Sequence, residues 1–399
     1  MQQQPTTATA IQTDKTYLLQ LYQQPDFVIE RGEGMYLYDM EGRRYLDFVS
    51  GIAVNALGYG DSAVVQAIAE QAAKLMHTSG LYHTRPAGEL AKALVERTPV
   101  FQRVYFGNSG TEVIEAALKF SRKFARTFHG EGKTGVVAFD GSFHGRTMGS
   151  VALTATEKYR LPFMPVMPDV RFAQYNDIAS IEATITDDVC AVFVEPVQGE
   201  GGLRVVSDAF MHRLRELCDQ HSALLVLDEI QCGMGRTGTL WAHEPYGVRP
   251  DMMAIAKPLA GGMPIGALLL NECVAEAISY GDHGTTFGGG PLATTVAKVV
   301  FDRISDPAFL ERVREVSSYL DEALHDFAAE RADTVIELRG RGLMRGLKIH
   351  GSAADVRMRG HDAGVLLAVA GADVVRMLPP LIVEPQHIDE VMAVLREIM

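Results

Sequence analysis

Short apolar runs that end abruptly in a charged side chain dominate the middle of the sequence. Residues 224–227 lead directly into Asp228, and the run 252–256 leads into Lys257. Four or five successive apolar residues are typical of a strand that is covered on both faces, as in a parallel sheet. Ligands of such sheets bind beyond the carboxyl ends of the strands. We therefore expect Asp228, Gln231 and Lys257 to lie near a ligand.

Apolar runs alternate with segments of helical periodicity through the central part of the chain. Strands are predicted at residues 104–106, 136–139, 190–194, 224–228, 252–256 and 266–270, and helices at 61–77, 111–125 and from Ser207 onward. This alternation predicts an α/β fold with a mainly parallel sheet and helices on both faces.

The two ends of the chain follow a different pattern. Two short strands are predicted at 35–39 and 44–48, a largely helical segment at 291–330, a hairpin at 335–339 and 346–349, and an amphipathic helix at 385–399. We predict a large domain over residues 56–290. A small α+β domain would combine residues 16–55 with residues 291–399, which begin with a linking helix. Residues 1–15, rich in Gln and Thr, are expected to form a flexible arm.

Composition narrows the class of partner. The 37 Lys and Arg are outnumbered by 50 Asp and Glu, a formal net charge of −13, and an acidic chain repels nucleic acid and anionic membranes. No apolar stretch is long and uninterrupted enough for a membrane span. The four cysteines have neither metal-binding nor disulfide spacing, so no metal is expected. Residues 1–15 lack the features of a secretory or transit signal, and the cytoplasm is the expected compartment.

Three features carry candidate chemistry. Residues 107–111 join a strand to a helix, so their backbone N–H groups can face an anion, although a capping Ser or Thr explains the same pattern. Asp228 is either a ligand carboxylate or a cap. Lys257 must be buried, paired or covalently bound, and burial lowers the pKa of a lysine, which makes it nucleophilic. A phosphate cradle, a carboxylate for a ring nitrogen and a Schiff-base lysine together match pyridoxal phosphate.

From about Tyr36 to the C-terminus, the sequence resembles the class III (omega) aminotransferases of fold type I. The motifs are Asn-Ser-Gly-Thr-Glu (108–112), Phe-His-Gly-Arg (143–146), Glu-Pro-Val-Gln-Gly-Glu-Gly-Gly (195–202), Leu-Asp-Glu-Ile-Gln (227–231), Gly-Arg-Thr-Gly (235–238), Ala-Lys (256–257), Thr-Thr-Phe-Gly-Gly (285–289) and Arg376 before Pro-Pro-Leu (379–381). Within the family, residues 51–55 and 374–380 are most similar to members that act on N-acetylornithine.

The resemblance implies a role for each cofactor-binding residue. Lys257 would hold pyridoxal phosphate as a Schiff base and move the proton, and Asp228 would pair with the pyridine nitrogen. The remaining cofactor contacts would be Ser109, Gly110 and Thr111 at the phosphate, Phe143 and Ile230 on the two ring faces, Gln231 at the ring hydroxyl, and Thr286 from the other subunit. The active form would therefore be a homodimer with shared sites.

The resemblance also implies how one site handles two substrates. The omega-amino group of N-acetylornithine would pass to 2-oxoglutarate, as in arginine biosynthesis. Arg146 would bind the carboxylate far from the reacting amine, and Arg376 the alpha-carboxylate of glutamate. Glu200 would cover Arg376 while the omega-amine donor is bound, and Thr285 is a candidate donor contact. Ornithine, 4-aminobutyrate, succinylornithine or a carrier-bound lysine precursor, and less readily an aminomutase reaction, remain alternatives.

Other noticeable residues have structural interpretations. His144 is expected to be a neighbour of Phe143, Glu195 to order the loop after its strand, Arg236 to brace a turn and Trp241 to lie in the core. Residues 340–346 are expected to form a tight turn in the small domain.

The sequence departs from the family pattern at three positions. Tyr59 stands in a segment where relatives have a Gly-His-x-His-Pro run, Gly80 replaces an Asn, and Gly290 replaces the Asn after a double glycine. By resemblance, Tyr59 and Gly80 are expected near the substrate entrance, where they bear on the choice of donor.

Overall fold

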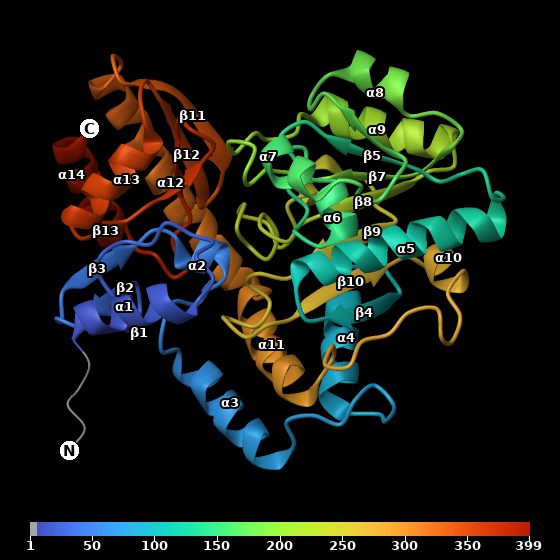
Figure 1. The fold of residues 1–399 in the computed structure, drawn as a ribbon, viewed down its shortest axis with the longest axis horizontal. Coiled ribbons are helices and arrows are strands. Elements are labelled where there is room, and N and C mark those ends of the chain that lie inside the picture. Colours follow the sequence, from blue (N-terminus) through green and yellow to red (C-terminus); the bar gives the residue numbers. More distant parts are fainter. Residues whose placement is uncertain (1–5) are drawn as a thin grey trace.

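A seven-stranded sheet forms the centre of the large domain in this computed structural model, which describes residues 6–399 (Figure 1). Its order is β4 (Arg103–Gly107), β10 (Gly266–Leu270), β9 (Met252–Ile255), β8 (Leu224–Asp228), β7 (Val189–Val194), β5 (Gly135–Phe139) and β6 (Val170–Ala173). Strand β10 is antiparallel to both neighbours, and all other pairs are parallel. The apolar runs predicted as buried strands are fully buried in β5, β7, β8, β9 and β10.

Helices cover both faces of this sheet because alternate residues of each buried strand point to opposite sides. Helix α5 (Gly110–Phe128) packs on one face, where Val226 of β8 belongs to its core, whereas α9 (Asp208–Gln220) packs on the other face with Leu225 and Leu227. The large domain also contains α3 (Ser62–Lys74), α4 (Arg85–Arg97), α6 (Met148–Ala152), α7 (Glu157–Arg160), α8 (Ile178–Thr184) and α10 (Glu272–Glu276).

Both ends of the chain build the small domain. Strands β1 (Ile29–Glu33), β2 (Tyr36–Asp39) and β3 (Arg44–Asp47) form a sheet with β13 (Val365–Leu366), and a second sheet has the order β11 (Val335–Arg341), β12 (Met344–Ile349), β15 (Val374–Met377), β14 (Ala368–Ala370). Helix α11 (Pro291–Ile304), the expected linking helix, packs against α3 and α4 of the large domain, and the helices of the small domain are α12 (Pro307–Glu330), α13 (Ala353–Asp362) and α14 (Pro385–Ile398). In Figure 1 the blue N-terminal strands lie beside the red C-terminal helices. The predicted fold class is confirmed; the exact boundaries at residues 55 and 290 stay predictions.

Two N-terminal features were not predicted. Helix α1 (Thr7–Tyr17) begins in the expected arm and extends two residues beyond it; Thr6 caps it and none of its residues is buried. Residues 1–5 of that arm lie outside the described residues. In addition, α2 (Ser50–Ala53) is a left-handed turn, with positive φ at all four residues, a conformation that is costly for residues other than glycine. Asp47 stabilises the turn by accepting hydrogen bonds from the backbone N–H groups of Val49 and Ser50.

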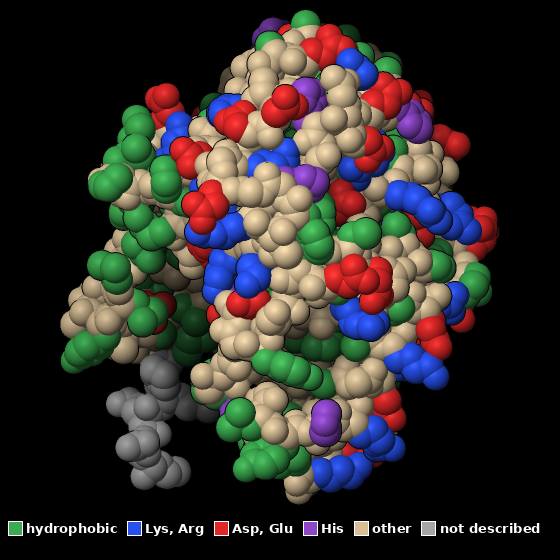
Figure 2. All heavy atoms as spheres, turned by 90° about the vertical axis from the view of Figure 1, so that its right-hand side faces the viewer, with side chains coloured by type: hydrophobic (Ala, Val, Ile, Leu, Met, Phe, Trp, Pro, Cys, Tyr) green, Lys and Arg blue, Asp and Glu red, His purple; other side chains and the backbone are tan. Residues whose placement is uncertain are grey.

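The surface is mixed in charge on the face shown in Figure 2, where acidic and basic side chains are interspersed. The net charge of −13 therefore arises from a modest acidic excess on a mixed surface and gives no sign of a basic path for nucleic acid on this face. Of the helices in the described part of the chain, none combines the length and the apolar character that crossing a membrane requires.

Candidate active site

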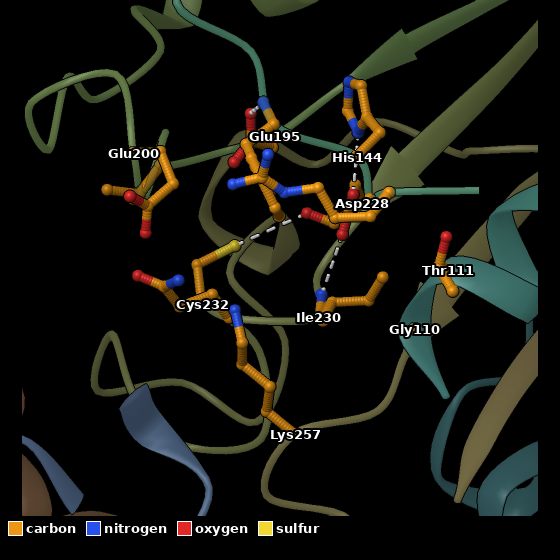
Figure 3. Close-up of a pocket in the computed structure, with 14 residues that line it drawn as sticks. Gly110, Thr111, His144, Glu195, Glu200, Asp228, Ile230, Cys232 and Lys257 are labelled. Atoms are coloured by element: carbon orange, nitrogen blue, oxygen red, sulfur yellow. Dashed lines mark hydrogen bonds and ion pairs between the residues drawn. The ribbon is translucent and has the colours of Figure 1, made fainter. Parts of the chain in front are cut away.

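The loops and helix that follow five strands, β4, β5, β7, β8 and β9, meet at one cavity of about 260 Å³ (Figure 3). All five strands run in the same direction, so their carboxyl ends share one edge of the sheet. The sequence-predicted site residues that line this cavity are Gly110, Thr111, Phe143, Arg146, Glu200, Asp228, Ile230, Gln231 and Lys257. The order of strands in the sheet thus gathers residues from widely separated parts of the chain.

Asp228 ends strand β8 and is fixed by two hydrogen bonds. Its Oδ1 accepts from the backbone N–H of Ile230 (3.0 Å), and its Oδ2 lies 2.7 Å from Nδ1 of His144. Both side chains are buried. Burial alone would lower the pKa of His144, but the hydrogen bond to Asp228 and its negative charge outweigh burial and raise it. His144 therefore donates to Asp228 and helps to orient this carboxylate.

The sequence analysis expected His144 to be a structural neighbour of Phe143, and the structure adds a contact with Asp228 that was not predicted. His144 acts on the site through Asp228, although it is 84 residues away along the chain. Strand β7 separates β5 from β8 in the sheet, so only the three-dimensional order brings the loop after β5 to the end of β8. In the sequence, the only sign of a role for His144 was its position next to Phe143, and this position did not identify Asp228 as its partner.

Lys257 follows strand β9 and extends into the cavity from the side opposite His144 (Figure 3). Within residues 6–399 its Nζ has no hydrogen-bond or ion-pair partner. Burial lowers the pKa of Lys257, and the nearby charge of Arg376 lowers it further, while Glu200, Asp228 and Glu195 act in the opposite direction. An unpaired amine with a lowered pKa is suited to covalent attachment to a carbonyl carbon.

The N-terminus of α5 forms the third wall of the cavity. Gly110 and Thr111 line it, at the first turn of a helix whose initial N–H groups lack acceptors within the helix. A Cβ atom at Gly110 would lie 2.9 Å from Cδ1 of Ile230, so a glycine is needed for the close approach of these two segments. Ser109 does not line the cavity, because its Oγ caps α5 by accepting from the N–H of Glu112 (3.3 Å).

These features fit the chemistry of pyridoxal phosphate, the cofactor that the sequence implies. A helix N-terminus suits a phosphate, Asp228 suits a protonated ring nitrogen, and the free amine of Lys257 suits an aldehyde. The three groups lie on different sides of the same cavity (Figure 3). The residues present are therefore able to hold this cofactor.

An ion pair closes one side of the site. Arg376 on β15 is buried, and its Nη1 donates to Oε1 of Glu200 (2.7 Å), to the carbonyl of Gly199 (3.1 Å) and to Oε1 of Gln231 (3.2 Å). Glu200 lines the cavity, whereas Arg376 does not. The pairing of Glu200 with Arg376 that the resemblance implies is thus present, with the carboxylate between the cavity and the arginine.

Glu195 orders the loops around the cavity, as the sequence analysis expected. Its two carboxylate oxygens accept from the backbone N–H groups of Phe143 (3.1 Å) and Gly199 (3.2 Å). Burial raises the pKa of Glu195 to about 7. One carboxylate therefore fixes both the aromatic wall and the loop that leads to Glu200.

Besides Ser109 and Arg376, two further predicted site residues, Thr285 and Thr286, do not line the cavity. Thr285 Oγ1 accepts from Nδ2 of Asn108 (3.3 Å) and from the N–H of Gly288 (3.1 Å). Thr286 is exposed, and neither threonine lines the cavity. Within one chain, the site is therefore built without them.

The three departures from the family pattern do not line this cavity either. Tyr59 is half-buried; its Oη donates to Oδ2 of Asp47 (2.5 Å) and its ring lies against Gly32, so its place near the substrate entrance stays a prediction. Gly80 is exposed, and Gly290 is the N-cap of α11.

The structural interpretations of the remaining residues hold. Trp241 is buried in the core, and its Nε1 donates to Oγ1 of Thr98 (2.7 Å). Arg236 is buried and donates to the carbonyls of Leu343 and Pro379, so it braces the turn between β11 and β12 as well as the segment after β15.

Comparison with known proteins defines the family. The family model for aminotransferase class-III matches residues 19–399. The chain belongs to this family. It is therefore a pyridoxal-phosphate-dependent aminotransferase, and its substrates are an amino acid and a keto acid.

Individual relatives support the same conclusion. The acetylornithine aminotransferase, mitochondrial, of Alnus glutinosa is 49% identical over 383 residues, which are 95% of this chain and 84% of that protein. The N-acetylornithine aminotransferase structure from Stenotrophomonas maltophilia has a TM-score of 0.84 and 37% identity, covering 97% of this chain and 98% of that chain. The ornithine aminotransferase structure from Toxoplasma gondii has a higher TM-score, 0.94, but 29% identity, covering 99% and 95% of the two chains.

Proposed function

We propose that this enzyme transfers the omega-amino group of N-acetylornithine to 2-oxoglutarate, which yields N-acetylglutamate 5-semialdehyde and glutamate, as in arginine biosynthesis. The observation that carries the proposal is the ion pair of Glu200 with Arg376, 2.7 Å between Oε1 and Nη1. It neutralises one arginine while Arg146 stays available at the cavity. The 49% identity to a protein named acetylornithine aminotransferase supports this donor over ornithine.

The cofactor-binding residues act as follows. Pyridoxal phosphate, when bound, supplies an aldehyde for the amine and a ring that takes up electrons. Lys257 would hold it covalently and then, as the free amine, carry the proton between the substrate carbon and the cofactor. Asp228, oriented by His144, would pair with the ring nitrogen. Gly110 and Thr111 with Ser109 behind them would form the phosphate end, Phe143 and Ile230 would cover the two ring faces, and Gln231 would reach the ring hydroxyl.

The substrate-binding residues would separate two carboxylates. Arg146 would bind the carboxylate distant from the reacting amine, bidentately, in both substrates. Arg376 would bind the alpha-carboxylate of glutamate after Glu200 has moved aside. With N-acetylornithine, Glu200 would remain paired and keep the arginine neutralised. An aminomutase, which acts on a single substrate, has no need of such a removable carboxylate.

We further propose that the active form is a homodimer in which Thr286 completes the phosphate site of the partner subunit and Thr285 contacts the donor. The exposure of Thr286, and of the neighbouring Phe287 (65% exposed), supports this arrangement. An exposed aromatic side chain next to a polar ligand candidate is typical of a surface that another subunit covers. The cytoplasm stays a prediction for the compartment, since the Alnus glutinosa relative is named mitochondrial.

A donor comparison tests the proposal. Glutamate formation from 2-oxoglutarate would be measured with N-acetylornithine, ornithine, succinylornithine and 4-aminobutyrate at equal concentrations. N-Acetylornithine should give the highest kcat/KM, and Lys257→Ala should abolish turnover with every donor. If another donor has an equal or higher kcat/KM, the assignment to N-acetylornithine is wrong, although the aminotransferase class stands.

A further inference from the structure

Arg146 is held in an unusual way for a residue with a full positive charge. Its guanidinium carbon lies 3.7 Å from the ring centroid of Tyr159 and 5.3 Å from that of Phe143. Over the residues that the structure describes, the Arg146 side chain has no hydrogen-bond or ion-pair partner. The attraction of a cation to an aromatic face uses the flat side of the guanidinium and none of its N–H groups. Arg146 is thus anchored with all of its donors free.

The contrast with Arg376 shows what this means for binding. Arg376 donates from Nη1 to the carboxylate of Glu200. That carboxylate competes with any substrate carboxylate for the same N–H groups. An aromatic anchor does not compete, because the ring carries no negative charge in the guanidinium plane. Anchoring by a ring therefore suits an arginine that must receive a carboxylate in every half-reaction.

Tyr159 is itself fixed. It lies on the four-residue helix α7, and the next residue, Arg160, ties this helix down by donating from Nη1 to the carbonyl of Thr154 (2.9 Å) and by lying 4.6 Å over the ring of Phe172 on β6. The Tyr159 ring also meets the ring of Phe143 edge to face, at 6.3 Å and 88°. The position of the ring is thus set by the large-domain sheet and by the aromatic wall of the cavity.

We propose that Tyr159 is a positioning residue for carboxylate recognition: it holds Arg146 by the flat face of the guanidinium and leaves the N–H fork free for a substrate carboxylate. Tyr159 does not line the cavity and acts only through Arg146. The proposal rests on the proposed function in one respect, the assignment of Arg146 to the distal carboxylate. It adds that the selectivity for donors with this carboxylate depends on an aromatic ring at position 159.

The Tyr159 hydroxyl has no hydrogen-bond partner in the described structure, so matched variants separate the ring from the hydroxyl. Tyr159→Phe keeps the ring, whereas Tyr159→Leu and, as a second truncation, Tyr159→Met remove it. The two donors to compare are N-acetylornithine and N-acetylputrescine, which is the same molecule without its carboxylate. Lys158→Ala is the control for a cation that lies farther from the same ring, at 5.4 Å.

Loss of the ring should raise KM for N-acetylornithine roughly 2- to 30-fold, the range that corresponds to one cation–π contact, with little change in kcat. The kcat/KM for N-acetylputrescine and the visible absorbance of the bound cofactor should not change. Tyr159→Phe and Lys158→Ala should resemble the parent. In an Arg146→Ala background, Tyr159→Leu should cause no further loss with N-acetylornithine, because there is no guanidinium left to position.

Two results would overturn the proposal. Unchanged KM in both Tyr159→Leu and Tyr159→Met would mean that the ring does not position Arg146, and equal losses with both donors would mean a general structural role. Either result leaves the proposed function intact as long as the parent enzyme prefers N-acetylornithine. Equal use of the two donors by the parent enzyme would instead refute both, since Arg146 would then bind no carboxylate.

Discussion

Two arginines lie at or beside the cavity, and they differ in what holds them in place. Arg376 is buried and paired with Glu200, whereas Arg146 is exposed and lies against aromatic rings. A buried arginine without its carboxylate is costly, so Arg376 needs either Glu200 or a substrate carboxylate at all times. Glu200 can therefore act as a stand-in for the alpha-carboxylate of glutamate, and its removal should affect the two substrates differently.

Glu200→Ala should weaken the half-reaction with N-acetylornithine more than the half-reaction with glutamate. With N-acetylornithine the variant leaves Arg376 without a carboxylate, and a lost charged hydrogen bond corresponds to roughly tenfold or more in kcat/KM. With glutamate, the substrate itself supplies the carboxylate. Single-turnover measurement of each half-reaction by cofactor absorbance checks this expectation, with Glu200→Gln as the variant that keeps the shape. Equal losses in both half-reactions would exclude the role of Glu200 as a stand-in.

Glu195 makes the stability of the cofactor-free protein dependent on pH. Its pKa is raised from 4.5 to about 7 because burial penalises the carboxylate. Between these two pH values the folded protein retains a proton that the unfolded chain has released, so the free energy of unfolding should fall as pH rises, by at most about 3 kcal/mol. Denaturant unfolding at the two ends of this window measures the fall. Glu195→Gln cannot release a proton and should give a flatter dependence; an unchanged slope would contradict the assignment.

At the scale of elements, the strands predicted most reliably from the sequence are those buried on both faces, because an apolar run alone identifies them. The runs that became β8 and β9 are apolar throughout because both faces are covered, and Asp228 and Lys257 follow from where these strands end. Nothing in the apolar run of β10 distinguishes its antiparallel direction, because burial on two faces looks alike in either direction. The left-handed turn at α2 was missed because it depends on Asp47 and on tertiary contacts, not on glycine alone.

The start of α5 was predicted as an anion site, and Ser109 was included in it. In the structure the Ser109 hydroxyl caps the helix and does not line the cavity, so we expect it to act on the cofactor site by stabilising the turn that presents Gly110 and Thr111. The spacing of a phosphate loop and that of a capped helix are the same in sequence, since both need a small polar residue before the first turn. Only the direction of the hydroxyl separates the two roles.

Two serine caps allow a matched test at this scale. Ser109 caps α5 at the cavity, and Ser207 caps α9 on the other face of the sheet, with hydrogen bonds of 3.3 and 3.4 Å. Ser109→Ala and Ser207→Ala should each lower the free energy of unfolding by about 0.5–2 kcal/mol, the usual range for a lost cap. Cofactor affinity, measured by equilibrium titration, should fall only in Ser109→Ala. Equal affinity in the two variants would show that the cap does not support the phosphate end.

At the scale of the whole molecule, the site depends on how the two domains meet. Glu200 belongs to the large domain, whereas Arg376 lies on β15 of the small domain, 176 residues away along the chain. Arg236 of the large domain also donates to the carbonyl of Pro379, close after β15. Sequence spacing gives no information on such contacts, so the Glu200–Arg376 pair came from the family resemblance and His144–Asp228 from the structure alone. The domain interface thus supplies one of the two arginines that we propose to bind substrate carboxylates.

The proposed dimer extends the site beyond one chain, and mixing two variants with different defects tests this. Lys257→Ala lacks the essential amine, and Thr286→Ala should bind the cofactor weakly, because a hydrogen bond to the charged phosphate contributes about 1.5–3 kcal/mol. In a heterodimer of the two, one site combines Lys257 of one subunit with Thr286 of the other and should regain activity at limiting cofactor. The control is a mixture of Lys257→Ala with Asp228→Ala, which should stay inactive. Lys257 and Asp228 line the cavity of the same chain, so each site of this heterodimer lacks one of the two residues. Activity that stays absent after exchange of subunits, with heterodimers demonstrated by differently tagged chains, would place Thr286 outside the partner's phosphate site.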